Sequence, residues 1–169
     1  IGRWTAEMFL IFNLCKPDIF PADDLGLIKG ICNCYGLKYP ISKENAIKLS
    51  KWLKDHPNIE WVNHTAFPDH PSHDRCKKYL NNQFPTVFTF GVKGGYDAGK
   101  SFIEKVKLAS HLANVGDAKT LVIHPSSTTH SQLSQSDQSA AGVSPDMVRV
   151  SVGLEHIEDI KEDFEQALA

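Results

Sequence analysis

The chain has 169 residues, of which 41% are hydrophobic and 22% charged, and its formal net charge is −2 at pH 7. These values suit an ordinary globular protein, and the small net charge excludes a global attraction to nucleic acid or to an anionic membrane. No apolar run approaches the roughly 20 residues that a membrane-spanning helix needs, so no membrane partner is expected.

The N-terminal third of the sequence shows helical spacing of its apolar residues. Such spacing predicts helices over residues 3–14 and 25–35, the second ended by Gly36, and a third over residues 46–53. The chain begins without a methionine or a polar cap, which predicts that it is truncated.

Short strand-like and helical runs alternate after Pro57, and this alternation predicts an α/β layer structure. The composition changes between Pro40 and Pro57, so we expect a helical segment over residues 1–42 and an α/β domain over residues 43–169. The Ser/Thr/Gln-rich stretch 126–139 is interpreted as a long loop with a short helix. The predicted strands are 59–62, 86–92, 120–123 and 148–152, and the predicted helices are 73–80, 101–112, 137–141 and 157–168.

The spacing of the four cysteines indicates the redox state of the compartment in which the protein is expected. Cys15, Cys32, Cys34 and Cys76 form no C-x-x-C pair, and the Cys32–Cys34 spacing is too tight for most metal sites. We therefore expect reduced thiols in a cytoplasmic protein.

Two motifs near the N-terminus have either a structural or a functional interpretation. The sequence G-R-W-T-A begins at Gly2, and a helix that starts after a glycine can approach a phosphate closely. The adjacent carboxylates Asp23 and Asp24 open the second predicted helix, where acidic residues commonly serve as caps.

In combination, G-R-W-T-A-E-M-F and D-I-F-P-A-D-D-L-G-L resemble helix-hairpin-helix DNA glycosylases of the 3-methyladenine type over residues 2–36. The resemblance implies that Gly2 ends a DNA-gripping hairpin and that Asp24 is the catalytic aspartate. Trp4 falls where bifunctional relatives carry a catalytic lysine, which implies base removal without strand cleavage. A base-excision activity is the alternative function. Because the first helix of the hairpin is missing, DNA is not expected as a partner.

Arg149 is the most informative residue of the C-terminal part, because it interrupts an apolar strand between Val148 and Val150. Its planar guanidinium can bind a carboxylate through two parallel hydrogen bonds. The strand context alone leaves two interpretations open, a structural ion pair with a nearby acid and a binding site for a carboxylate ligand.

Residues 44–169 resemble the C-terminal domain of the O-acetylhomoserine sulfhydrylases, in the pyridoxal-phosphate-dependent Cys/Met metabolism family. The resemblance runs from E-N-A at 44–46 through H-P at 56–57, D-H-P-S-H at 69–73 and F-G-V-K-G-G at 90–95 to E-Q-A-L at 165–168. It includes A-N-V-G-D-A-K-T-L-V-I-H-P at 113–125 and the segment around Arg149. It implies the small domain of a fold-type I enzyme, with a mostly antiparallel sheet and helices on one face. It also implies that Arg149 and Asn114 bind the substrate α-carboxylate, and that Thr128, Thr129 and His130 form an active-site loop.

The same resemblance implies pyridoxal 5′-phosphate as the cofactor and a small amino acid as the substrate, in homocysteine and methionine biosynthesis. The lysine that holds the cofactor belongs to the family's large domain, and no lysine of this chain has the surrounding Ser/Thr-rich motif. We therefore expect the chain to need a large domain or a homo-oligomeric partner, and to be inactive alone.

Two further patterns suggest other chemistry. Residues 94–101 match the phosphate-loop pattern G-x-x-x-x-G-K-S after a predicted strand, but the later strand 120–123 ends in His124 rather than in a magnesium-binding aspartate. His70, His73 and Cys76 have the spacing of zinc ligands, although their helix supplies no fourth ligand, and a structural role is preferred. The charged pair at 162–163 is interpreted as a solvated helix face.

Overall fold

The structure is a computed structural model that describes residues 41–169. Ser42–Ala169 form one compact unit. The two helices predicted before residue 40, together with Gly2, Trp4 and Asp24, lie outside the described residues. No helix within residues 41–169 combines the length and the apolar character that crossing a bilayer requires.

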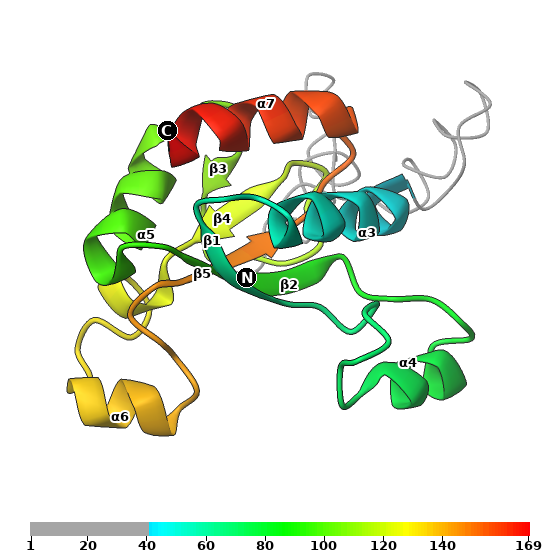
Figure 1. Ribbon diagram of the computed structural model, residues 1–169, viewed down its shortest axis with the longest axis horizontal. Coiled ribbons are helices and arrows are strands. Elements are labelled where there is room, and N and C mark those ends of the chain that lie inside the picture. The colour runs from blue at the N-terminus through cyan, green and yellow to red at the C-terminus, as the bar shows by residue number, and fades with distance from the viewer. Residues whose placement is uncertain (1–40) are drawn as a thin grey trace, which may run out of the picture. The chain divides into compact units, whose positions relative to one another are not determined.

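Five strands form one sheet in the order β1–β2–β5–β4–β3 (Figure 1). The neighbouring pairs are antiparallel except β3 and β4, which run parallel. The predicted mostly antiparallel sheet is therefore confirmed. The strands are β1 (Ile59–Asn63), β2 (Val87–Val92), β3 (Ser110–His111), β4 (Leu121–Ile123) and β5 (Met147–Ser151).

Three of the helices cover one face of this sheet, as expected, and α4 and α6 lie at the periphery (Figure 1). The covering helices are α3, α5 and α7, which all contribute residues to the buried cluster. The helices are α3 (Ile41–Lys54), α4 (His73–Tyr79), α5 (Gly95–Lys105), α6 (Gln135–Ala140) and α7 (Ile157–Leu168), with the 3₁₀ turn η1 at Pro125–Ser127.

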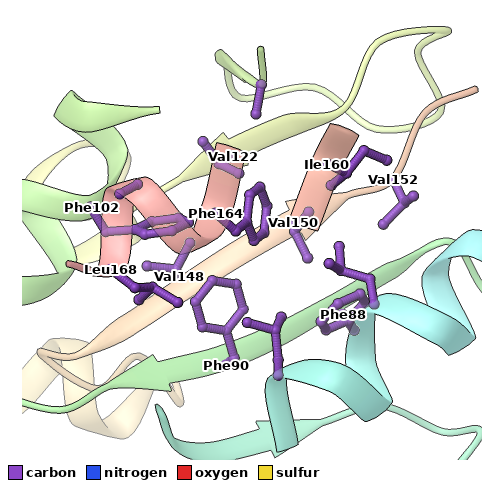
Figure 2. Packing of buried hydrophobic residues seen from close by; sticks show 14 of the residues in the cluster. Phe88, Phe90, Phe102, Val122, Val148, Val150, Val152, Ile160, Phe164 and Leu168 are labelled. Carbon is purple, nitrogen blue, oxygen red and sulfur yellow. The ribbon is translucent and has the colours of Figure 1, made fainter. Parts of the chain in front are cut away.

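An aromatic cluster forms the centre of the core between sheet and helices. The ring of Phe102 packs edge-on against those of Phe90 and Phe164, with centroid distances of 5.5 and 5.1 Å (Figure 2). Alternate strand residues complete the cluster from the sheet, which is the pattern of strands with one buried face. The strand residues of this cluster that point toward the helices include Phe88, Phe90, Val122, Val148 and Val150.

The predicted helix over residues 101–112 is wrong in its bounds, because α5 begins earlier and ends at Lys105. Gly94, at φ +104°, sets the start, since a left-handed backbone there suits glycine. Val106 is extended and ends the helix. The next residues are held by Asp163, whose carboxylate accepts hydrogen bonds from the backbone N–H groups of Lys107 and Ala109, at 2.6 and 2.9 Å.

The interpretation of residues 162–163 as a solvated helix face is wrong for Asp163. Its side chain is buried, whereas Glu162 is exposed. The other predicted strands and helices of residues 59–168 are confirmed to within about two residues. The strand β3 contradicts the prediction, because it lies where the helix over residues 101–112 was expected, and η1 was not predicted.

Candidate functional site

Arg149 lies in the middle of the sheet, on β5, and points away from the aromatic core. The register places it directly between Thr89 on β2 and Ile123 on β4. Because Val148 and Val150 point into the core, the pleat turns Arg149 to the opposite face, here called the Arg149 face. The side chain is half-buried there, and Arg149 is the only lysine or arginine in the five described strands.

No carboxylate of residues 41–169 forms an ion pair with this guanidinium. Its one hydrogen bond in that range is long, 3.5 Å from Nη2 to the backbone oxygen of Asn114. The side-chain oxygen Oδ1 of Asn114 accepts a local hydrogen bond from the N–H of Val115 at 2.9 Å. Arg149 and Asn114 are thus brought together, and the donors of the guanidinium are largely uncommitted within the described part of the chain.

The third predicted element, the turn Thr128–His130, follows η1, which lies beside β5. Thr128 Oγ1 donates to the backbone oxygen of His124 at 2.7 Å, and the backbone oxygen of His130 accepts from Nε2 of Gln138 at 2.9 Å. Thr129 is exposed. No hydrogen bond among the described residues joins this turn to Arg149, so its role in an active site stays a prediction.

A tryptophan–aspartate pair holds the residue that precedes β5, and sequence reasoning missed it. Trp61 Nε1 donates to Asp146 Oδ2 at 2.7 Å. The bond passes over Gly91, where an added Cβ would come within 2.0 Å of Oδ2 and 2.1 Å of Nε1. Glycine at this point of β2 is the one sequence signal that could have indicated a close approach.

Two fully buried histidines were also missed as structural elements. His64 and His124 each follow a strand and each bond a proline carbonyl through Nε2, at Pro85 and Pro145 respectively. Burial is the main cause that lowers the pKa of both imidazoles below the usual 6.5, against the raising effect of those carbonyls. Both rings are therefore neutral at physiological pH.

The structure does not form a phosphate loop from residues 94–101, because residues 95–98, which would have to make up the loop, already lie in α5. The three candidate zinc ligands are not grouped either. His70 Nε2 bonds the side-chain oxygen of Asn63, and His73 Nδ1 bonds the backbone oxygen of Thr65. Within residues 41–169 no three His, Cys, Asp or Glu side chains come together as a metal site.

A family model described as "Cys/Met metabolism PLP-dependent enzyme" matches residues 6–169. The chain belongs to this family. The match also extends over most of the segment that resembles DNA glycosylases, and no comparison supports that resemblance. The members of the family depend on pyridoxal phosphate, as the sequence resemblance implied.

Relatives agree on the kind of enzyme. O-acetyl-L-homoserine sulfhydrylase 1 of Thermus thermophilus is 58% identical over 126 residues, which are 75% of this chain and 30% of that protein. Homocysteine synthase of Schizosaccharomyces pombe is 52% identical over 125 residues, 74% of this chain and 29% of that protein. This chain therefore spans less than a third of the length of these two relatives.

A solved structure shows the same fold. A Campylobacter jejuni protein assigned as an O-acetylhomoserine (thiol)-lyase superposes with a TM-score of 0.70 at 36% identity, over 76% of this chain and 30% of that one. It contains N′-pyridoxyl-lysine-5′-monophosphate, a lysine joined to the cofactor. The mixed α/β domain seen here thus corresponds to part of a fold-type I enzyme of this family.

The described strands offer one guanidinium for a carboxylate but no lysine amine that could hold an aldehyde. The lysines of residues 41–169 all lie in the helices and loops.

Proposed function

We propose that the Arg149 face binds the α-carboxylate of an amino-acid substrate in an O-acetylhomoserine sulfhydrylase-like enzyme. In this reaction sulfide replaces the acetoxy group of O-acetylhomoserine, and the products are homocysteine and acetate. The observation that carries the proposal is the position of Arg149, half-buried in a central strand without a carboxylate partner in residues 41–169.

Charge and geometry support this assignment of Arg149. A half-buried guanidinium without a fixed acid is costly to desolvate, so a carboxylate ligand would supply the missing partner. Two parallel N–H···O bonds also fix the orientation of a planar carboxylate, which a lysine cannot do. The contact with the Asn114 oxygen leaves most of the five guanidinium donors free for such a ligand.

The cofactor would supply the electron-accepting ring that substitution at the γ-carbon requires. The residues of this chain do the binding: Arg149 holds the carboxylate, and the backbone at Asn114 flanks the guanidinium. We propose that the complete site forms when this domain meets the cofactor-bearing part of a longer polypeptide or of a partner subunit, and that the chain alone is inactive.

A chimeric enzyme tests the carboxylate assignment. Residues 44–169 of this chain would replace the corresponding part of the Thermus thermophilus relative, and kcat/KM for O-acetyl-L-homoserine would be measured. Arg149→Lys keeps the charge but loses the fork, and we expect kcat/KM to fall roughly 10- to 100-fold, which corresponds to the value of a charged hydrogen bond.

The matched control is Arg75→Gln, which removes one positive charge from the exposed surface of α4. It should leave kcat/KM within about twofold. Equal kinetics for Arg149→Lys and the unmodified chimera would refute the assignment.

The inactivity of the lone chain has a separate test. Purified chain would be mixed with pyridoxal phosphate, and the visible spectrum of bound cofactor and the formation of homocysteine would be followed. We expect neither signal, because the family resemblance places the cofactor lysine in a large domain, and no lysine of this chain has the surrounding Ser/Thr-rich motif. Steady turnover by the lone chain would contradict the proposal that the site is divided.

A further inference from the structure

His124 is the first residue after β4, and its side chain is completely buried. Both ring nitrogens are bonded, Nε2 to the backbone oxygen of Pro145 at 2.7 Å and Nδ1 to the hydroxyl of Ser127 at 2.8 Å. A carbonyl oxygen can only accept, so the single proton of the neutral ring lies on Nε2. The hydroxyl of Ser127 must then donate to Nδ1.

These two bonds connect segments that belong to different parts of the candidate site. Pro145 lies two residues before β5, the strand that carries Arg149. Ser127 ends η1 and directly precedes the turn Thr128–His130. The backbone oxygen of His124 adds a third link, because it accepts from Thr128 Oγ1 at 2.7 Å.

The ring is also held in place by α5. A Cβ added to Gly99 would lie 2.8 Å from both Cδ2 and Nε2 of His124, so the helix backbone touches the imidazole. The ring of Tyr96 packs edge-on against it at 5.1 Å between centroids. The imidazole therefore has one position available, and the segments bonded to it are fixed relative to each other.

We propose that His124 is a positioning residue, which fixes the turn Thr128–His130 relative to the start of β5 and thereby relative to Arg149. The functional consequence rests on the carboxylate-binding role of Arg149 proposed above. The linkage itself rests only on the contacts of the imidazole with Pro145 and Ser127.

The start of β5 offers a matched control, because it is held from its other side by Trp61 through Asp146. Trp61→Phe removes that hydrogen bond, and none of the described hydrogen bonds joins Trp61 to the turn. A variant of Trp61 should therefore loosen the start of β5 alone, whereas loss of His124 should loosen the start of β5 and the turn together.

The test is amide hydrogen exchange by NMR on the full chain. The reporters are the N–H groups of Thr128 and His130 for the turn, which bond the Pro125 oxygen, and that of Val92 for the start of β5, which bonds the Asp146 oxygen. The N–H of Val150, in the centre of the sheet, reports global unfolding. Ring ¹⁵N shifts should show a proton on Nε2 alone.

Three substitutions separate the two contacts of the ring. His124→Leu keeps apolar bulk but neither bond, and should speed exchange roughly tenfold at both the turn and the start of β5 relative to Val150. His124→Gln places an amide near the Nε2 position and should restore the start of β5 only. His124→Asn places an amide near the Nδ1 position and should restore the turn only.

Several outcomes would overturn the inference. Equal acceleration of the reporters and Val150 in His124→Leu would show that the ring contributes only to global stability. The same exchange pattern for His124→Gln and His124→Asn would show that its two bonds do not act separately, and this comparison remains decisive if the leucine variant does not fold. A proton on Nδ1 would also contradict the assignment.

Kinetics in the chimera test the functional consequence. His124→Gln, which frees the turn, should raise KM for O-acetyl-L-homoserine at least threefold, whereas unchanged KM and kcat would overturn the positioning role. The exchange pattern does not depend on what Arg149 binds. Failure of the carboxylate assignment and failure of the linkage can therefore be told apart.

Discussion

The glycine in the middle of β2 gives the sharpest test of the packing. In Gly91→Ala, the new Cβ would lie 2.0 Å from Asp146 Oδ2 and 2.1 Å from Trp61 Nε1, two atoms that are bonded to each other at 2.7 Å. The indole and the carboxylate must separate to admit it. Overpacking costs about 1–3 kcal/mol, and a hydrogen bond to a charged group contributes about 1.5–3 kcal/mol.

Alanine restricts the unfolded chain more than glycine does, and this effect stabilises the folded state by roughly 0.4–1 kcal/mol. We therefore expect Gly91→Ala to lower the free energy of unfolding by about 2–4 kcal/mol, measured by urea denaturation followed by circular dichroism. In a Trp61→Ala background the indole is gone and the carboxylate is free to turn away, so the same change should cost less than about 1 kcal/mol. An equal cost in both backgrounds would refute this account of the contact.

Three further predictions concern stability. Phe164→Ala, in the aromatic core, should cost about 3–5 kcal/mol in urea denaturation. Asp163→Ala leaves two backbone N–H groups without their acceptor and should lower the free energy of unfolding by about 2–4 kcal/mol. Glu162→Ala, at the exposed neighbouring residue, should change it by less than about 0.5 kcal/mol. Similar decreases for the two variants would contradict the role of Asp163 as the acceptor of these N–H groups. Because burial lowers the pKa of His64 and His124 in the folded state, stability should be full above pH 6.5 and fall as the pH drops below it. A pH series of thermal unfolding measures this, and His64→Gln with His124→Gln should flatten the decline.

Much of the fold could be predicted because its strands and closing helix carry their own periodicity. The alternation around Val148 and Val150 and the helical spacing from Ile157 onward each reflect one buried face. The bounds of α5 could not be predicted in the same way. The residues after its end are fixed by the carboxylate of Asp163, more than fifty positions away in the sequence, and no local pattern shows such a partner.

The candidate site could be predicted from the sequence only where a single residue departs from the pattern of its own strand or helix. Arg149 stood out because a charge interrupts an apolar strand, and its position on the Arg149 face follows from the pleat. Asn114 and the turn after Ser127 were indicated only by resemblance. The hydrogen bonds of Trp61 to Asp146 and of His124 to Pro145 join residues that are 85 and 21 positions apart. No local sequence pattern around these residues indicates either contact.

The two borders of the sheet differ from its centre in a way that affects how the domain can associate. β3 has only two residues, and β1 has an irregular register between Ile59 and Trp61, beside the exposed Glu60. Short, bulged or charged borders are poor templates for another chain's backbone. Extension of the described sheet into fibrils by edge-to-edge strand pairing is thereby discouraged.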